Sequence, residues 1–318
     1  MQTTKNYQNS RPFHYKRSNS HEKNRRRQNQ GFKFGKGTSL RGYGCSGHAS
    51  AYIIPELRLQ FDCGMLMKQY NKVSNIFISH AHLDHYSAIP SVVGLATMTK
   101  RPIKIYAHPI FIEKMEAILA LYEDLDGMEL THHTFVPIEI GDVIRMKKGI
   151  FVEVFEAFHV ENPNNIPAFS FAVYEERRKL KDEFKGLESR EIAELKMDGV
   201  EINDVTKYTR WFYTGDTTTE IFNLDVAKEA ENVITECTFL TDSLGGNAER
   251  YGHVQFSKLA EIIPTLNAKR IFLSHVSARH DSEQIAEAIK REDLFDDDRI
   301  VWVDNGLPRG APIYCVDD

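Results

Sequence analysis

Long apolar runs are absent from this 318-residue chain, and no stretch approaches the roughly 20 apolar residues that a membrane-spanning helix needs. The chain also opens without the apolar segment of a secretory signal peptide. These two absences argue against a membrane partner and against export. We therefore expect an intracellular protein.

Cysteine is scarce. The four cysteines, Cys45, Cys63, Cys237 and Cys315, are scattered along the chain and form no Cys-x-x-Cys pair. This spacing argues against a disulfide framework and against a thiolate metal site. It indicates reduced, structural thiols in a reducing compartment.

Acidic residues are nearly absent from residues 1–36, which hold ten Lys and Arg but only one acid, Glu22, for a net charge of +9. Because the whole chain carries −5, residues 37–318 must sum to −14. The tail is rich in Asn, Gln and Ser, has little to bury, and is predicted to be disordered. Three roles stay open: RNA binding through phosphates, a nuclear-import signal that would shift a cytoplasmic protein to the nucleus, or an extension with no dedicated role.

Histidine, by contrast, is concentrated at positions 80–85, which read HAHLDH and follow an apolar run that predicts a buried strand. Two histidines at i and i+2 in an extended backbone point to the same face, so His80 and His82 can bind one ion together. Asp84 and His85 follow as the chain turns away, and they can reach a second ion beside the first. The motif predicts a metal site.

Three more candidate ligands follow β-like runs: His159 after residues 151–155, Asp216 after 211–213, and His275 after 270–273. A carboxylate between two cations neutralises part of their repulsion, and Asp216 is the natural candidate for this bridge. Rigid strands that deliver ligands from their ends suit a sheet-based metallohydrolase. Imidazole and carboxylate donors without thiolate fit zinc, with manganese or iron as alternatives. The predicted metal ligands are His80, His82, Asp84, His85, His159, Asp216 and His275.

Several stretches of this chain resemble the metallo-β-lactamase-fold hydrolases and, within them, tRNase Z. The similarity runs from about Gly42 to Ile289 and is nearest to the short plant-type members. Leu83 stands where family members usually have glycine. The resemblance implies a four-layer αββα sandwich over residues 37–318, two Zn²⁺ per chain (Mn²⁺ as an alternative) and a homodimer. Besides the motif at 80–85, the stretches that carry it are Phe61–Gly64, Tyr213–Thr217, Thr235–Phe239, Tyr251–Val254 and Leu273–His280.

The resemblance also implies a reaction, which is cleavage of the 3′ trailer from precursor tRNA to leave a 3′-hydroxyl on the tRNA. In this mechanism a metal-activated hydroxide attacks phosphorus, and Asp84 orients the hydroxide as well as binding metal. His253 occupies the family position of a histidine that helps protonate the leaving oxygen. Glu236 is predicted to hold His253 in place. The predicted catalytic residues are therefore Asp84, His253 and Glu236.

Residues 175–209 depart from the family pattern, because they lack the Gly-Pro motif of the RNA-gripping arm of bacterial members. They are rich in charges of both signs and include a predicted helix at Leu187–Met197. We interpret them as a solvated insertion, with a shortened RNA-gripping arm as the second interpretation. The missing motif and the acidic folded part leave a cyclic-nucleotide phosphodiesterase as the alternative function, against which the basic tail argues. A non-catalytic RNA-binding scaffold gives no reason to keep the ligands and His253.

Apolar periodicity predicts the remaining elements. Strands are expected at 51–55, 57–62, 76–79, 103–107, 151–155, 168–174, 211–214, 233–236, 271–273, 300–303 and 313–316, and further helices at 111–125, 255–266 and 282–291.

Overall fold

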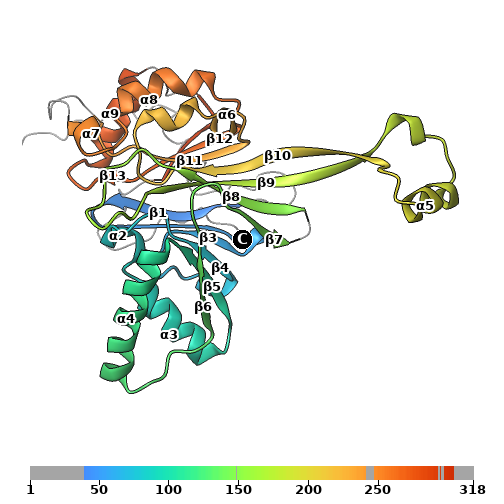
Figure 1. Ribbon diagram of the computed structural model, residues 1–318. Coiled ribbons are helices and arrows are strands. Elements are labelled where there is room, and N and C mark those ends of the chain that lie inside the picture. Colours follow the sequence, from blue (N-terminus) through green and yellow to red (C-terminus); the bar gives the residue numbers. More distant parts are fainter. Residues whose placement is uncertain (1–38, 148, 241–246, 293, 295–296, 304–318) are drawn as a thin grey trace, which may run out of the picture.

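Two seven-stranded sheets lie face to face, with helices on both outer faces (Figure 1). The computed structural model describes residues 39–147, 149–240, 247–292, 294 and 297–303. This arrangement confirms the predicted four-layer αββα sandwich. The predicted disordered tail at 1–36, the strand expected at 313–316, and Cys315 lie outside the described residues.

The first sheet carries the motif at 80–85 just beyond one of its strands. Its strands are β1 (Arg41–Ser46), β2 (Ala49–Ile54), β3 (Leu59–Phe61), β4 (Asn75–Phe77), β5 (Ile103–Ala107), β6 (His133–Pro137) and β13 (Val276–Ser277), in the order β13-β1-β2-β3-β4-β5-β6. The pairs β1–β2 and β2–β3 are antiparallel, so the strands expected at 51–55 and 57–62 form a hairpin. The strands from β3 to β6 pair in parallel.

The second sheet supplies the other three predicted ligands. Its strands are β7 (Val143–Lys147), β8 (Ile150–Glu156), β9 (Phe169–Leu180), β10 (Asn203–Tyr213), β11 (Asn232–Glu236), β12 (Arg270–Ser274) and β14 (Ile300–Trp302), in the order β14-β12-β11-β10-β9-β8-β7. The strands from β7 to β10 pair antiparallel, whereas β10, β11, β12 and β14 pair in parallel. After β12 the chain crosses to the first sheet, where β13 pairs with β1.

Helices cover the outer faces of both sheets. The α-helices are α2 (Leu83–Tyr86), α3 (Ile89–Thr99), α4 (Pro109–Asp126), α5 (Ser189–Met197), α6 (Asp225–Lys228), α7 (Asn247–Arg250), α8 (Phe256–Ile262) and α9 (Ser282–Arg291). Short 3₁₀ turns occupy Pro55–Leu57, Tyr70–Lys72, Asp182–Phe184, Thr219–Asn223 and Ile263–Thr265. The helix predicted at 255–266 is thus α8 followed by a 3₁₀ turn, where Pro264 cannot donate the next helical hydrogen bond. Across the described ranges, no helix has the length and apolar character to cross a membrane.

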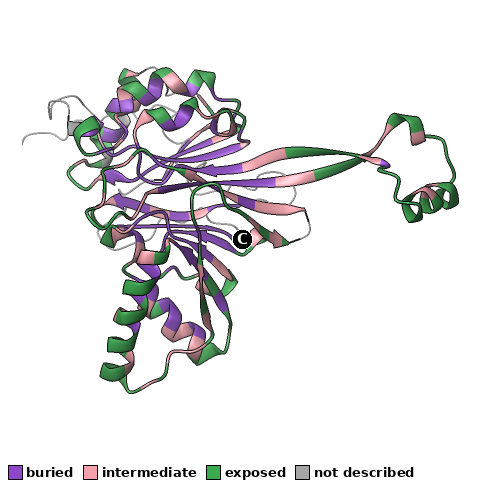
Figure 2. Ribbon diagram, viewed as in Figure 1, coloured by how far each residue is buried: buried purple, intermediate pink, exposed green. Residues whose placement is uncertain are grey.

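Aromatic side chains fill the space between the two sheets. Phe61 of the first sheet stacks on Phe171 of the second, with ring centroids 5.6 Å apart, and on Tyr213 at 5.0 Å. Trp211 and Phe272 stack beside them at 5.7 Å. Two further apolar clusters lie between each sheet and its own helices. Buried residues therefore follow the strands through the middle of the molecule (Figure 2).

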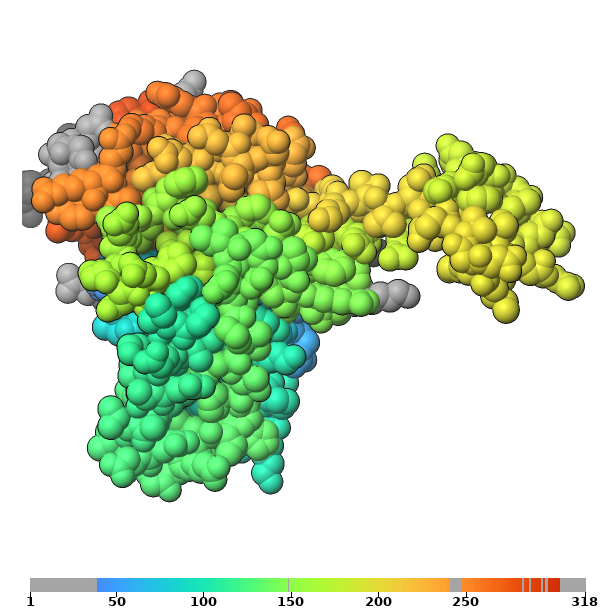
Figure 3. Space-filling view, in the orientation of Figure 1, coloured from blue at the N-terminus to red at the C-terminus, as the bar shows by residue number. Residues whose placement is uncertain are grey.

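A long arm projects from the sandwich where β9 and β10 continue beyond the second sheet (Figures 1 and 3). The two strands pair from Phe171 opposite Tyr213 out to Leu180 opposite Asn203. Helix α5 at the tip buries none of its residues, and it confirms the helix predicted at 187–197. Its first turn is closed by the Glu191 carboxylate, which accepts a hydrogen bond from the Glu188 backbone N–H at 2.9 Å. The charged stretch at 175–209 is this arm.

Candidate metal centre

The structure brings all seven predicted ligands together at one edge of the sandwich. They form two groups, and the ligand atoms within each group lie within 4.8 Å of one another. The first group contains three histidines and one aspartate, and the second contains two histidines and one aspartate. The first group is His80, His82, His159 and Asp216, and the second is Asp84, His85 and His275.

Both sheets deliver ligands to this edge from the ends of their strands. His80 follows β4, His159 follows β8 and Asp216 follows β10, while α2 carries Asp84 in its first turn. His275 lies in the crossing from β12 to β13 and has a positive φ of 60°. Because this backbone conformation is strained for residues other than glycine, the surrounding structure must hold it in place.

In the first group the histidine rings are oriented by neighbouring polar groups. His80 Nδ1 lies 3.0 Å from the Ser79 hydroxyl, and its buried Nε2 makes no hydrogen bond within the described part of the chain. His159 Nδ1 donates to the carbonyl oxygen of Gly252 at 2.8 Å. Its Nε2 therefore faces the group and lies 3.3 Å from His82 Nδ1. The ligand nitrogens of His80, His82 and His159 therefore lie within 4.8 Å of one another.

The second group lies around the Asp84 carboxylate. Asp84 Oδ2 is 3.7 Å from His85 Nε2 and 3.4 Å from His275 Nε2. The same oxygen accepts a hydrogen bond from the backbone N–H of Gly47 at 2.9 Å. The turn between β1 and β2, which contains Gly47, thereby fixes one ligand of the group.

Asp62, which the sequence did not single out as a site residue, orients His85. Its fully buried carboxylate accepts from His85 Nδ1 at 2.7 Å and from the Ser79 backbone N–H at 2.7 Å. It also accepts from the Tyr213 hydroxyl, which comes from the opposite sheet. Metal-ligating histidines are commonly oriented by such carboxylates, so this contact directs His85 Nε2 into the site. The signal in the sequence was an aspartate directly after an apolar run.

Asp216 lies between the two groups. Its Oδ2 is 3.7 Å from His80 Nε2 in the first group and 3.4 Å from His85 Nε2 in the second. Its Oδ1 is 3.5 Å from His275 Nδ1. This carboxylate is thus the one predicted ligand whose oxygens approach both groups.

Burial and neighbouring charges in the site favour the protonation states in which the side chains can bind metal. Burial lowers the pKa of His80, His82 and His159, and neighbouring imidazoles lower the pKa of His80 and His82 further. Burial alone would raise the pKa of Asp84, but the hydrogen bond from His275 and the charge of His85 hold it at about 2. Neutral imidazoles and ionised carboxylates are the forms that bind metal.

The carboxylates around His85 favour a positive charge at this position. Burial opposes this charge, but Asp216 and Asp62 outweigh burial and raise the pKa of His85 well above its usual value. Burial likewise opposes ionisation of Asp216, yet His275 and His85 hold its pKa well below the usual range. Negative charge concentrated this deeply calls for a cation. The buried Nε2 atoms of His80 and His85 make no hydrogen bond with any residue that the structure describes, and the residues therefore fit a metal centre.

His253 lies beside the ligand groups, with its ring centroid 4.9 Å from that of His159. Its Nδ1 is 2.8 Å from Glu236 Oε1, so the predicted Glu236–His253 contact is present. Burial lowers the pKa of His253, but the Glu236 carboxylate outweighs burial and raises it to about 9. Because Nδ1 is held by Glu236, Nε2 is the ring nitrogen that a substrate can reach.

Thr238 links Glu236 to a second histidine, a connection that the sequence did not predict. Its hydroxyl donates to Glu236 Oε2 at 2.6 Å and lies 3.1 Å from His275 Nδ1. Glu236 also accepts from the Thr217 backbone N–H at 2.8 Å. One buried carboxylate thus orients the predicted acid directly and a predicted ligand through a threonine.

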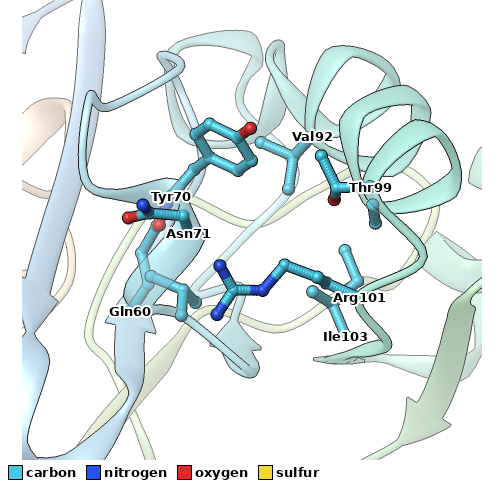
Figure 4. A pocket seen from close by; sticks show the side chains of 9 residues that line it. Gln60, Tyr70, Asn71, Val92, Thr99, Arg101 and Ile103 are labelled. Atoms are coloured by element: carbon cyan, nitrogen blue, oxygen red, sulfur yellow. The ribbon is translucent and has the colours of Figure 1, made fainter.

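Two cavities differ in what they can hold. One, beside Gln60 and Arg101, has a volume of about 10 Å³ and is lined by side chains from β3 and α3 (Figure 4). That volume holds roughly one water molecule, which excludes it as a substrate site. The other, beside His253, has a volume of about 320 Å³.

Comparisons with known proteins agree with this geometry. Residues 54–181 match the family model described as a beta-lactamase superfamily domain. tRNase Z TRZ1 of Arabidopsis thaliana is 33% identical over 259 residues, which cover 80% of this chain and 90% of that protein. The chloroplastic tRNase Z TRZ2 of the same plant is 32% identical, with 79% of this chain and 71% of the relative covered. Human tRNase Z, short form, shares the fold, with a TM-score of 0.51 at 21% identity over 76% of this chain and 93% of the human chain.

The fold and the two ligand groups define a metal-dependent hydrolase of the metallo-β-lactamase fold. The alignment with tRNase Z TRZ1 covers 80% of this chain at 33% identity. The chain belongs to the tRNase Z family, which confirms the resemblance seen in its motifs.

Proposed function

We propose that this protein is an endoribonuclease that removes the 3′ trailer from precursor tRNA and leaves a 3′-hydroxyl on the tRNA body. The observation that carries the proposal is the Glu236–His253 pair beside the two ligand groups. Hydrolysis of a phosphodiester needs a proton donor for the leaving oxygen next to the cations that bind the phosphate. The names of the plant relatives, both tRNase Z, support tRNA as the substrate.

Two zinc ions are proposed, one in each ligand group, with Asp216 between them. Bound there, they would lower the pKa of a water molecule and offset negative charge on the scissile phosphate. The donor set of imidazole and carboxylate supports zinc, and Mn²⁺ is the alternative.

The chain's own residues would handle the protons. Asp84 would accept a hydrogen bond from the attacking water while it serves as a ligand. His253 would donate the proton on Nε2 to the leaving 3′-oxygen. Glu236 would keep the ring in place through Nδ1–H and stabilise its protonated form.

The arm favours RNA over a mononucleotide as substrate. Arg177, Arg178, Lys179 and Lys181 place four cations within five positions of its first strand and the residue that follows. The Arg177 guanidinium lies 4.1 Å from the ring centroid of Tyr208. Arg177 and Arg178 also pair with Glu175 and Glu176 on the same strand. Cations beside an aromatic ring suit a surface that follows a nucleic-acid backbone. A cyclic mononucleotide bound at the metal centre would be too small to use an arm that projects away from the sandwich.

Three further properties belong to this proposal. The protein would act as a homodimer inside the cell, in the cytoplasm or, if residues 1–36 are an import signal, in the nucleus. Residues 37–318 would form the hydrolase domain, with the arm at 175–209 as its charged insertion. Residues 1–36 would contact RNA phosphates through their net charge of +9.

The test is to offer the purified protein a precursor tRNA with a 3′ trailer and, in parallel, cyclic mononucleotides. We expect one cut after the tRNA body, with a 3′-hydroxyl and a 5′-phosphate identified by end mapping. Chelation should abolish the cut, and added Zn²⁺ should restore it. Hydrolysis of a cyclic nucleotide without cleavage of the tRNA would replace the proposal with its alternative.

A further inference from the structure

The cavity of about 320 Å³ lies beside His253, and none of the predicted metal ligands lines it. One wall is the segment that follows Asp216, and the other is formed by α7 and the start of α8. A volume of this size is at the lower end of the range for small-ligand pockets, roughly 300–1,000 Å³. The lining residues are Thr218, Thr219, Glu220, Ala248, Glu249, His253, Gln255 and Lys258.

The charges of the cavity select against a phosphate. Glu220 and Glu249 contribute two carboxylates, while Lys258 contributes one ammonium group. That ammonium group is already paired with Glu249. An anionic group would meet an unbalanced carboxylate, so the cavity suits a neutral, polar occupant.

We propose that this cavity binds the nucleoside that carries the leaving 3′-oxygen, the last nucleoside of the tRNA body. The inference rests on the proposed function. Since Glu236 holds His253 Nδ1, the leaving oxygen must approach Nε2. In this arrangement the scissile phosphate would lie over the metal ligands, and the sugar and base attached to the leaving oxygen would continue into the cavity that His253 lines.

The hydrogen-bonding groups of the cavity predict which bases bind there. The Glu220 carboxylate makes no hydrogen bond or ion pair within the described ranges, and so offers two free acceptor oxygens. The Gln255 amide N–H donates to the Ser257 hydroxyl at 2.9 Å, which leaves its carbonyl oxygen as another acceptor. An exocyclic amino group, present in adenine, cytosine and guanine, offers these acceptors two N–H donors, whereas uracil offers them only its ring N3–H. The site therefore favours bases with an amino group over uridine.

The experiment compares trailer-bearing tRNAs that differ at one nucleotide. At the last body nucleotide, an abasic residue should lower kcat/KM about tenfold or more, the scale of removing one base-recognition interaction. Uridine there should be cleaved more slowly than cytidine. An abasic residue at the first trailer nucleotide should change kcat/KM less than about twofold, because that nucleotide lies outside the cavity.

Variants then test the named residues. Glu220→Gln replaces one acceptor with a donor, and should bring the cytidine-to-uridine ratio of kcat/KM closer to one. Glu116→Gln, the same charge change on the exposed face of α4, should leave the ratio unchanged. Equal losses from the two abasic substrates, or an unchanged ratio in both Glu220→Gln and Gln255→Ala, would overturn the inference while the proposed function stands. If no trailer-bearing tRNA is cleaved, the proposed function is wrong and this inference is wrong with it.

Discussion

Three histidines in the metal centre each have one ring nitrogen in contact with a polar group of the protein and the other directed into the site. Asp62 holds His85, the Gly252 carbonyl holds His159, and Ser79 lies against His80. Such contacts fix ring orientation before any cation binds, so little reorganisation is needed on binding. At the scale of single residues, the site is prepared by its supporting hydrogen bonds as much as by its ligands.

Asp216 should be the ligand whose loss affects both groups. We expect Asp216→Ala to lose at least one of two bound metal ions and nearly all turnover, because its oxygens approach His80, His85 and His275. Elemental analysis of the purified variant measures the first effect. Asp124→Ala, on the exposed face of α4, is the matched control and should keep its metal content. A fully loaded, active Asp216→Ala protein would remove Asp216 from the bridging role.

His253 should matter for turnover and not for metal. Its Nδ1 is used by Glu236, and it belongs to neither of the two proposed ligand groups, although its ring lies near Asp216 and His275. We expect His253→Ala to keep its metals and fold but to lose about 10²–10⁴-fold in kcat, the usual range for general acid–base catalysis. Loss of metal in this variant would instead assign His253 as a ligand.

Tyr213 and Tyr52 form a natural matched pair, because both are buried between the sheets with ring centroids 5.3 Å apart. The Tyr213 hydroxyl donates to Asp62, which holds His85, whereas the Tyr52 hydroxyl donates to Ser274 at 2.8 Å. We therefore expect Tyr213→Phe to weaken metal binding about 10–100-fold, the usual effect of removing a supporting partner.

The metal-free protein is titrated with Co²⁺, and the visible absorption of the bound Co²⁺ is recorded during the titration. Tyr213→Phe should shift both the affinity and the spectrum of the site that contains His85. Tyr52→Phe, which removes a hydroxyl at similar depth but not from Asp62, should change the spectrum less. Identical spectra and affinities in the two variants would show that Tyr213 acts only in packing.

At the scale of elements, the loop after β3 fixes the position of α2. The Cys63 backbone N–H donates to the His85 carbonyl at 2.6 Å, and the Gly64 N–H donates to the Ser50 carbonyl at 2.9 Å. A Cβ atom at Gly64 would lie 1.8 Å from the carbonyl oxygen of Asp84. The loop can approach α2 this closely only because glycine stands at position 64.

Gly64→Ala should therefore displace the helix that carries two predicted ligands. We expect a loss of about 1–3 kcal/mol in the free energy of unfolding, the usual cost of overpacking, together with weaker metal binding. Urea denaturation measures the first effect. Gly94→Ala in α3 is the control, since its Cβ would meet nothing within 4 Å. That change should stabilise the protein by about 0.5–1 kcal/mol through helix propensity. Equal stabilities for the two variants would contradict the steric argument.

The arm shows where prediction from the sequence failed at this scale. Its helix was predicted, but the extension of β9 and β10 was not. Apolar alternation marks a strand only when one face meets a core, and the arm has no core on either face. Its stretch Glu175–Lys179 consists entirely of charged residues. Helix α3 was missed for a related reason, because β-branched residues, glycine and Pro90 hide its buried face.

The predicted ligands were easier to find, because each lies directly after a strand-like run and its chemistry is visible locally. Contacts between distant residues were not visible in a single sequence. Tyr213 and Asp62 are 151 positions apart, and nothing local in either segment predicts that one donates to the other. Thr238 beside Glu236 was quoted only as part of a motif, and its contact with His275 depends on the parallel pairing of β11 and β12.

At the scale of the whole molecule, the metal centre depends on closure of the sandwich. The first sheet supplies His80, Asp84 and His85, while the second supplies His159 and Asp216. Hydrogen bonds from Tyr213 to Asp62 and from Tyr52 to Ser274 cross between the sheets near the site. Because neither sheet contains all the ligands, separation of the sheets should destroy the metal centre before either sheet unfolds.

The net charge also differs between the two parts of the chain: it is +9 in residues 1–36 and −14 in residues 37–318. An acidic hydrolase that acts on RNA gains from a cationic segment, because pairing of cations with phosphates releases condensed counterions. Deleting residues 1–36 should therefore weaken binding of trailer-bearing tRNA. It should also flatten the salt dependence of log K by about 0.7–0.9 for each phosphate that the tail no longer neutralises. Turnover at saturating substrate should barely change, since every predicted catalytic residue lies at Asp84 or beyond.

The measurement is tRNA affinity of the full and truncated chains across a salt series. A full-length variant with the ten Lys and Arg of the tail replaced by Ser separates charge from length, and it should behave like the truncated chain. Cyclic mononucleotides supply the second control, because a single phosphate cannot engage an extended cationic segment. Equal affinity and equal slope for the full and truncated chains would reject RNA binding by the tail. Import, or no dedicated role, would then be the better account of residues 1–36.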